Sequence, residues 1–322
     1  MRLVVDPWDP SYGISDQQSG DVDEGEAVVD VEFSPDDWHT IDAVPGLFEP
    51  VVFVDGVRRV DARVWVDDFP GMAASWAAGA VLCDDRPARL GPVMVDRAVF
   101  SGLADLFPIN ARHGHWRACI TESPAPDKLT LALQHAMAAT ETAVAREAVE
   151  LSGGELVVVD GPLKGRDHEA DVLGLVKTHH RSYLAGAQAA VLVALQPGER
   201  TPVFLTGLNF PRHSWYLRLP GPSGGVMTGV VRIEASASLT PQQAIGLAVK
   251  SAAVLPRFAS QPHKDSRAPQ NLFPIAGLER QLRHRLGDAR LLYRSLRDAA
   301  NSLEDVKKAS GFGAATRFDY GG

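Results

Sequence analysis

Two short segments of the chain are nearly identical, and both have the composition of a buried strand. Residues 51–56 are Val-Val-Phe-Val-Asp-Gly, and residues 156–161 are Leu-Val-Val-Val-Asp-Gly. Continuous apolar runs of this length are typical of strands buried on both faces at the centre of a sheet. Two such strands lying side by side would bring Asp55 and Asp160 together. Adjacent carboxylates repel unless they share a proton or a cation, so the pair indicates a divalent metal site.

An Asp-Gly pair is also a common hairpin turn, which gives each motif a second interpretation. Residues 58–66 alternate between polar and apolar side chains, so a hairpin over residues 51–67 is expected. An acid in that position can both begin a turn and bind a metal. Asp160 is followed by Gly161-Pro162-Leu163 without a return strand, so the turn interpretation is weaker there.

Composition and charge limit the class of protein. The chain has 322 residues, of which 45% are hydrophobic and 22% are charged, as in soluble globular proteins. It contains no apolar run of the roughly 18 residues that a membrane span needs, and no signal-peptide pattern. Cys83 and Cys119 are too few for a disulfide framework and lack zinc-ligand spacing. A cytoplasmic location without membrane association is therefore expected.

The pattern of predicted elements indicates the fold class and the domain organisation. Residues 1–45 form an acidic extension, residues 46–300 a single domain, and residues 301–322 a flexible tail. Strands followed by a helix and then by alternating strands and helices predict an α/β (α+β) fold with a mixed central sheet flanked by helices. Strands are expected at 51–67, 73–83, 91–99, 115–121, 156–160, 171–176, 203–206, 215–219 and 229–235, and helices at 127–151, 182–195, 241–254, 274–286 and 289–301.

The helix expected at 127–151 lies between the two strands that end in acids. Leu133, Met137, Val144 and Ala148 recur at helical spacing, and Glu141 lies on the flank of this apolar stripe. An acid in that position is often a boundary residue whose carboxylate reaches water. The alternative is a third metal ligand, because a two-metal phosphodiester site needs several carboxylates.

These residues resemble the NurA family of nucleases over roughly residues 50–285. The resemblance depends on the order and spacing of five segments: 53–56, 158–163, 172–178, 215–219 and 231–234. It implies a ribonuclease H-like core and a NurA-like nuclease domain at 46–300. The implied activity is Mn²⁺- or Mg²⁺-dependent DNA hydrolysis, as a 5′–3′ exonuclease and single-strand endonuclease. The family also implies a homodimer that works with a HerA-type hexameric ATPase in DNA end resection and repair.

The resemblance assigns roles to individual residues. Asp55, Glu141 and Asp160 would be the metal ligands, and Lys177 would contact the scissile phosphate. The C-terminal part departs from the family, because Asn271 and Glu279 stand where archaeal members have an aromatic residue and a histidine. Glutamate can bind a metal but cannot act as a neutral base near pH 7, as histidine can. The expected catalytic residues are Asp55, Glu141, Asp160, Lys177, Asn271 and Glu279.

Basic residues close to these motifs are candidates for DNA binding. The net charge is −8, so nucleic acid would have to bind a local basic groove. Trp215, Tyr216 or Phe273 could offer stacking surfaces for bases. The alternative is that the basic side chains only balance neighbouring acids. The expected DNA-binding residues are Arg58, Arg59, Lys177, Arg181, Lys264 and Arg267.

Two other classes of protein are compatible with parts of the sequence. An actin-like sugar or acid kinase has the same core and strand-end aspartates, but it should carry Gly-rich phosphate loops, and Gly161-Pro162-Leu163 is a poor one. A non-catalytic partner of a hexameric DNA-translocating ATPase would use its acids for structural hydrogen bonds. Binding of Mn²⁺ distinguishes this scaffold from a nuclease.

Overall fold

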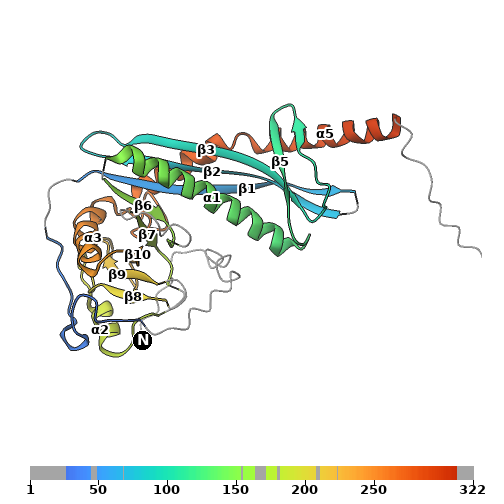
Figure 1. Cartoon of the computed structure of the whole chain (residues 1–322). Coiled ribbons are helices and arrows are strands. Elements are labelled where there is room, and N and C mark those ends of the chain that lie inside the picture. Colours follow the sequence, from blue (N-terminus) through green and yellow to red (C-terminus); the bar gives the residue numbers. More distant parts are fainter. Residues whose placement is uncertain are drawn as a thin grey trace, which may run out of the picture. The chain divides into compact units, whose positions relative to one another are not determined.

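The computed structural model describes residues 27–44, 49–67, 69–153, 155–163, 172–179, 182–207, 211–222 and 224–309. Its strands form a sheet in the order β4-β5-β3-β2-β1-β6-β7-β10-β9-β8, and Figure 1 labels most of these strands and the helices α1, α2, α3 and α5. The strands are β1 (Val51–Val66), β2 (Phe69–Cys83), β3 (Arg89–Ser101), β4 (Ile109–Ala111), β5 (Gly114–Ile120), β6 (Leu156–Asp160), β7 (Val172–Val176), β8 (Phe204–Thr206), β9 (Arg212–Arg218) and β10 (Val230–Ser236). The helices are η2 (Pro35–Asp37), α1 (Pro126–Ser152), α2 (Gly186–Ala194), α3 (Pro241–Val254), η3 (Leu255–Phe258), α4 (Phe273–Arg285) and α5 (Ala289–Ala309).

The sheet is mixed, and its centre carries the two motifs that resemble each other. Strand β6 pairs in parallel with both β1 and β7, while β10 pairs antiparallel with β7 and β9. The order β3-β2-β1-β6-β7, with β6 and β7 parallel to β1, is that of a ribonuclease H-like core. The expected α/β fold with a mixed, helix-flanked sheet of this kind is confirmed.

The chain divides into two compact units, and β1, β2, β3, α1 and α4 each contribute residues to both. Among the described residues, the first unit lies within 27–56, 78–94 and 138–282, and the second within 57–77, 95–137 and 283–309. In the first unit, the C-terminal half of α1 packs on the sheet through Val144, Ala145 and Ala148. Burial of these apolar side chains stabilises the centre of the sheet, where the acids lie.

Strand alternation separates two faces of this central sheet. Successive side chains of a strand point to opposite faces. Val52 and Val54 of β1 pack with α1, together with Val157 and Val159 of β6. Phe53 faces the other way and contacts Phe258 of η3, with ring centroids 5.1 Å apart. By the same alternation, Asp55 and Asp160 lie on the face opposite α1.

The second unit has its own core. Trp76 of β2 and Phe100 of β3 pack with Leu129 and Leu133 from the N-terminal half of α1. Trp116 of β5 forms a separate cluster with Ala73 and with two leucines of α5, Leu292 and Leu296. Each unit therefore buries its own apolar side chains, which is the basis of its stability.

The hairpin expected over residues 51–67 is wrong. Strand β1 continues through Asp55-Gly56 to Val66. A two-residue Asp-Gly hairpin of type I′ needs positive φ at both residues, whereas neither Asp55 nor Gly56 has one. Among the non-glycine residues described, only Asp67 has a positive φ, of 51°, and it follows the end of β1.

Two further differences concern the ends of the chain. Helix α5 continues to Ala309, so its described residues extend past the position near 301 where a tail was expected to begin. The expected acidic extension is described only over residues 27–44, and residues 310–322 lie outside the described structure. None of the helices in the part of the chain described here is long and apolar enough to cross a membrane.

Candidate metal centre

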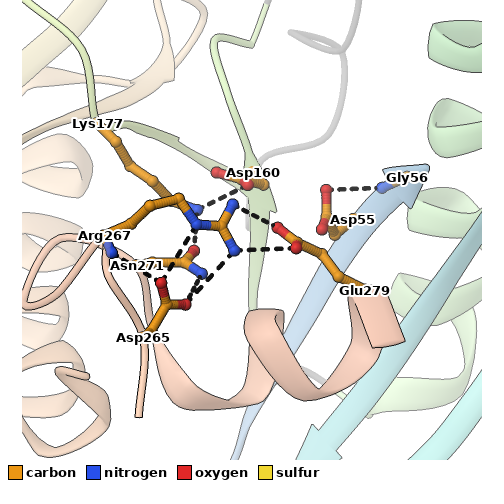
Figure 2. Close-up of polar contacts among 8 residues, drawn as sticks. All are labelled: Asp55, Gly56, Asp160, Lys177, Asp265, Arg267, Asn271 and Glu279. Atoms are coloured by element: carbon orange, nitrogen blue, oxygen red, sulfur yellow. Dashed lines mark hydrogen bonds and ion pairs between the residues drawn. The ribbon is translucent and has the colours of Figure 1, made fainter. Parts of the chain in front are cut away.

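Three carboxylates converge where β1 and β6 lie side by side. The register pairs Val54 with Val159, so Asp55 and Asp160 follow at the same level of two parallel strands. Helix α4 contributes Glu279, which is buried. Each of the three offers a carboxylate oxygen, and these oxygens lie within 4.8 Å of one another. Figure 2 shows the three side chains, which come from segments far apart in the sequence.

Of these three acids, Asp55 has the fewest described partners that offset its negative charge. Its Oδ1 accepts a hydrogen bond of 2.7 Å from the backbone N–H of Gly56. Its Oδ2 is buried and has no hydrogen-bond partner among the described residues. Burial, and then the charge of Asp160, raise the pKa of Asp55 well above its ordinary value; Lys177 opposes this shift, and Glu141 and Glu279 add to it. The acids around Asp55 therefore carry negative charge that a cation would relieve.

Lys177 compensates Asp160. This lysine directly follows β7, and its side chain is 3% exposed. Its Nζ donates to Asp160 Oδ2 at 2.7 Å and to Asn271 Oδ1 at 2.6 Å. The side chain of Gln270 donates to the backbone carbonyl of Lys177 at 3.2 Å, which holds the segment in place. A buried ammonium group is stable here because both acceptors face it.

Arg267 compensates Glu279. Its two terminal nitrogens donate to Glu279 Oε1 and Oε2, both at 2.9 Å, which is a bidentate pair. The same guanidinium contacts Asp265, and Asn271 Nδ2 donates to Asp265 Oδ2 at 2.6 Å (Figure 2). Burial opposes ionisation of Asp265, but the bonds from Asn271 and Arg267 hold its pKa below the ordinary value. Asp265 thus connects the residues that contact Lys177 and Glu279.

Asp265 was not anticipated from the sequence. It lies in a loop whose neighbouring residues, Lys264 and Arg267, indicated DNA binding instead. A carboxylate among basic residues normally only balances their charge. Its contact with Asn271 depends on the tertiary path of residues 265–271, which no sequence periodicity encodes.

Glu141 is close to the cluster but is not one of its three members. It is buried, on α1, and its carboxylate lies against Gly56: a Cβ at position 56 would be 2.3 Å from Glu141 Oε1. By strand alternation, position 56 lies on the same face of β1 as Val52 and Val54, which is the face that packs on α1. The side chain of Asp55 lies on the opposite face. The glycine therefore allows the glutamate to approach β1, and Glu141 acts on Asp55 through charge.

The expected DNA-binding residues have different surroundings. Arg59 pairs with Asp61 at 3.0 Å, within the second unit, and Arg58 is half-buried on β1. Lys264 is exposed and lies 4.9 Å from the ring centroid of Phe273. Arg267 is engaged by carboxylates as described above, and Arg181 lies outside the described residues.

Two of the expected stacking residues are inside the protein. Trp215 and Tyr216 on β9 are 0% and 1% exposed, so neither ring is available to a base. The indole N–H of Trp215 donates to Ser251 at 3.1 Å, a core contact. The prediction that these aromatic residues offer stacking surfaces is wrong, because Trp215 is buried under α3 and Tyr216 is buried on the opposite face with Phe204 and Leu192 of α2.

The donor set suits a hard divalent cation. Mg²⁺, Mn²⁺ and Ca²⁺ prefer carboxylate oxygens, and the cluster supplies three carboxylates on rigid elements. The buried Asp55 Oδ2, without a partner in the described structure, is an oxygen that a cation would satisfy. The residues present therefore fit a divalent metal ion.

Comparisons with known proteins identify the family through one domain model. The NurA domain model matches residues 51–279. Among solved structures, the NurA nuclease from Sulfolobus solfataricus is similar at a TM-score of 0.49 and 10% identity, covering 81% of this chain and 88% of that one. The catalytic domain of human endonuclease V has a TM-score of 0.34 at 16% identity, covering 77% and 90%. Endonuclease V from Bacillus subtilis has a TM-score of 0.33 at 11% identity, covering 79% and 87%. No curated protein sequence matches the chain significantly.

Proposed function

The chain belongs to the NurA domain family, and from this premise we propose that it is a nuclease that hydrolyses DNA phosphodiester bonds with a divalent metal ion, Mn²⁺ or Mg²⁺. The matched region runs from the strand that carries Asp55 to the helix that carries Glu279. All three residues of the carboxylate cluster therefore lie within the matched region, and Glu279 is its last residue.

The observation that carries the proposal is the convergence of three carboxylates around an unsatisfied oxygen. Asp55, Asp160 and Glu279 would hold the ion, because their oxygens lie within 4.8 Å of one another and Asp55 Oδ2 lacks a partner in the described structure. A divalent ion supplies an activated water and stabilises charge on the phosphate oxygens. Glu141 contributes negative charge beside Asp55, which strengthens the attraction for a cation.

The other residues would orient the site and bind the phosphate. Lys177 holds the Asp160 carboxylate through a 2.7 Å ion pair and places a positive charge where a phosphate would approach. Asn271 fixes the direction of the Lys177 ammonium group. Arg267 fixes the Glu279 carboxylate, so that both acids are pre-organised before a ligand arrives.

The mode of cleavage, the assembly, the location and the partner that we propose are those implied by the resemblance to the NurA family. We propose a NurA-like nuclease domain at 46–300 that acts as a 5′–3′ exonuclease and single-strand endonuclease. It would be a cytoplasmic homodimer that works with a HerA-type hexameric ATPase in DNA end resection and repair. Arg58 and Lys264, whose side chains make no ion pair with another described residue, would contribute to DNA binding.

One observation favours a second candidate function. Two of the three carboxylates already have cationic partners, Lys177 on Asp160 and Arg267 on Glu279. Buried ion pairs of this kind can also be purely structural. A non-catalytic partner of a hexameric DNA-translocating ATPase is therefore the alternative, and it predicts no DNA cleavage with any metal.

The test is cleavage of end-labelled single- and double-stranded DNA with Mn²⁺, Mg²⁺ or EDTA. We expect cleavage with a metal ion, none with EDTA, and loss of cleavage in Asp160→Asn. The control is Asp84→Asn, because Asp84 lies between β2 and β3 and pairs with Arg89, not with a residue of the cluster. Full activity in Asp160→Asn would refute the assigned site, and inactivity of the wild type with both metals would favour the scaffold.

A further inference from the structure

Helix α5 is held in the second unit by one face. Leu292 and Leu296 are buried against Trp116 and Ala73. The backbone N–H of Leu291 donates to Asp288 Oδ1 at 2.8 Å, which satisfies one of the amide groups at the start of the helix. The buried side chains determine which residues α5 presents to solvent over its first two turns.

The opposite face of the same turns carries three arginines. At 100° per residue, Arg290, Arg294 and Arg297 fall within an arc of about 60°. All three are exposed. None of their guanidinium groups makes a hydrogen bond or ion pair with another residue of the described chain, whereas Arg59, Arg200 and Arg267 are all bonded to carboxylates.

An aromatic ring lies beside these arginines. Tyr293 is 47% exposed, and with Ala289 and the three arginines it lines a shallow hollow of about 310 Å³. We call this set, Arg290, Tyr293, Arg294 and Arg297, the α5 basic face. An exposed aromatic ring among guanidinium groups is the combination with which proteins hold single strands, through base stacking and phosphate contacts.

The charge of this region is opposite to that of the protein. Over residues 283–298 the sequence has five arginines, at 283, 285, 290, 294 and 297, against two acids, Asp288 and Asp298. The whole chain has a net charge of −8. A local excess of positive charge on an acidic protein attracts a polyanion to that place and not to the rest of the surface.

We infer that the α5 basic face binds single-stranded nucleic acid, with the arginines on successive phosphates and Tyr293 stacked on an unpaired base. The identity of that strand as DNA rests on the proposed nuclease function. A duplex would offer the phosphates but no free base, so the exposed tyrosine favours the single strand. None of these residues belongs to the carboxylate cluster, so this is a separate binding surface.

The experiment measures binding without cleavage. A fluorescently labelled single-stranded oligonucleotide is titrated with the full chain in EDTA, and anisotropy is followed over a range of salt concentrations. The variant Arg290→Gln/Arg294→Gln/Arg297→Gln should bind at least about tenfold more weakly, and the slope of log K against log salt should fall by about 2. Tyr293→Ala should weaken single-strand binding by at least about fivefold and leave duplex binding nearly unchanged.

A matched control removes the same charge elsewhere. Arg63, Arg86 and Arg112 are exposed, and no ion pair with another described residue engages their side chains. The variant Arg63→Gln/Arg86→Gln/Arg112→Gln should retain wild-type affinity and salt slope. Thermal melting establishes that each variant is folded. If the triple variant at α5 does not fold, Arg294→Gln alone should still lower the slope by about 0.7.

The outcomes separate this inference from the proposed function. Cleavage of a small chromogenic thymidine phosphodiester with Mn²⁺ reports the carboxylate cluster alone. If the wild type cleaves that ester while the α5 variant binds DNA as tightly as the wild type, the α5 inference is refuted and the nuclease proposal stands. If nothing is cleaved but binding depends on the arginines, the binding surface stands without the nuclease. Competition by polyaspartate as strong as by DNA would indicate an acidic protein partner and also overturn the inference.

Discussion

Two buried carboxylates on the same strand have opposite surroundings. Asp61 of β1 has a side chain that is 0% exposed, and both of its oxygens are satisfied: Oδ1 by Arg59, and Oδ2 by the Ser75 hydroxyl and the Trp116 indole N–H. Asp55, six residues earlier, has one oxygen without a partner in the described structure and three acids as electrostatic neighbours.

The difference indicates what each acid is for. A buried carboxylate with a full set of donors stabilises the fold, because its charge and its hydrogen bonds are compensated inside the protein. A buried carboxylate left with unbalanced negative charge lowers stability and is retained where an external cation completes it. We therefore expect a structural role for Asp61 in the second unit and a metal-binding role for Asp55 in the first.

The largest effect is expected for Asp55→Asn. Removing this charge should reduce metal-dependent DNA cleavage to background, because the ion loses the buried Asp55 oxygen that no other group in the described structure satisfies. The metal-free protein should melt at the same temperature or higher, because the substitution relieves repulsion with Asp160, Glu141 and Glu279. Cleavage assays and thermal melting in EDTA check both parts. A large drop in melting temperature would instead indicate that Asp55, like Asp61, stabilises the fold.

Asp61→Ala should show the reverse pattern. Arg59, Ser75 and Trp116 would lose a common acceptor, and the free energy of unfolding should fall by roughly 2–4 kcal/mol. Denaturant unfolding measures this change. Asp84→Ala is the control, since its surface pair with Arg89 should contribute little to stability. The rate of DNA cleavage per folded molecule should stay near that of the wild type. A loss of cleavage without a loss of folded protein would contradict the contrast between a structural Asp61 and a metal-binding Asp55.

Asp265→Asn tests the residues that support the cluster. Asp265 holds Asn271 and Arg267, which in turn contact Lys177 and Glu279. Supporting partners of metal ligands typically affect affinity or activity by about 10–100-fold, and a loss of this size in Mn²⁺ affinity is expected. Calorimetric titration of Mn²⁺ measures it, with exposed Asp36→Asn as a control. An unchanged Mn²⁺ affinity would show that Asp265 does not support the metal ligands.

The smallest effect is expected for Glu141→Gln. Glu141 lies on the α1 face beside Gly56, so it should act on the metal by charge and not by direct ligation. A severalfold loss of Mn²⁺ affinity, with cleavage still detectable, is the expected result. Inactivity equal to that of Asp55→Asn would instead place Glu141 among the ligands.

The central part of this arrangement could be predicted from the sequence for physical reasons. Two all-apolar runs of strand length must be buried, and buried parallel neighbours bring their ends together. That reasoning brought Asp55 and Asp160 to one place, and the register of β1 with β6 agrees. The turn at Asp55-Gly56 was wrong because Gly56 serves for the close approach of Glu141, not for positive φ.

The rest depends on tertiary packing. Helical periodicity placed Glu141 toward the sheet, but it could not distinguish the α1 face from the face that carries Asp55. Glu279 joins Asp55 and Asp160 because α4 lies on that second face, which its local sequence does not encode. Asp265 acquires its contacts with Arg267 and Asn271 only through the path of one loop.

Calorimetric titration of Mn²⁺ into the metal-free wild type, Asp55→Asn and Asp61→Asn tests the account most directly. We predict millimolar or tighter binding to the wild type, loss of that binding in Asp55→Asn, and wild-type affinity in the folded fraction of Asp61→Asn. Equal Mn²⁺ affinity in the wild type and Asp55→Asn would contradict the assignment of the carboxylate cluster as a metal centre.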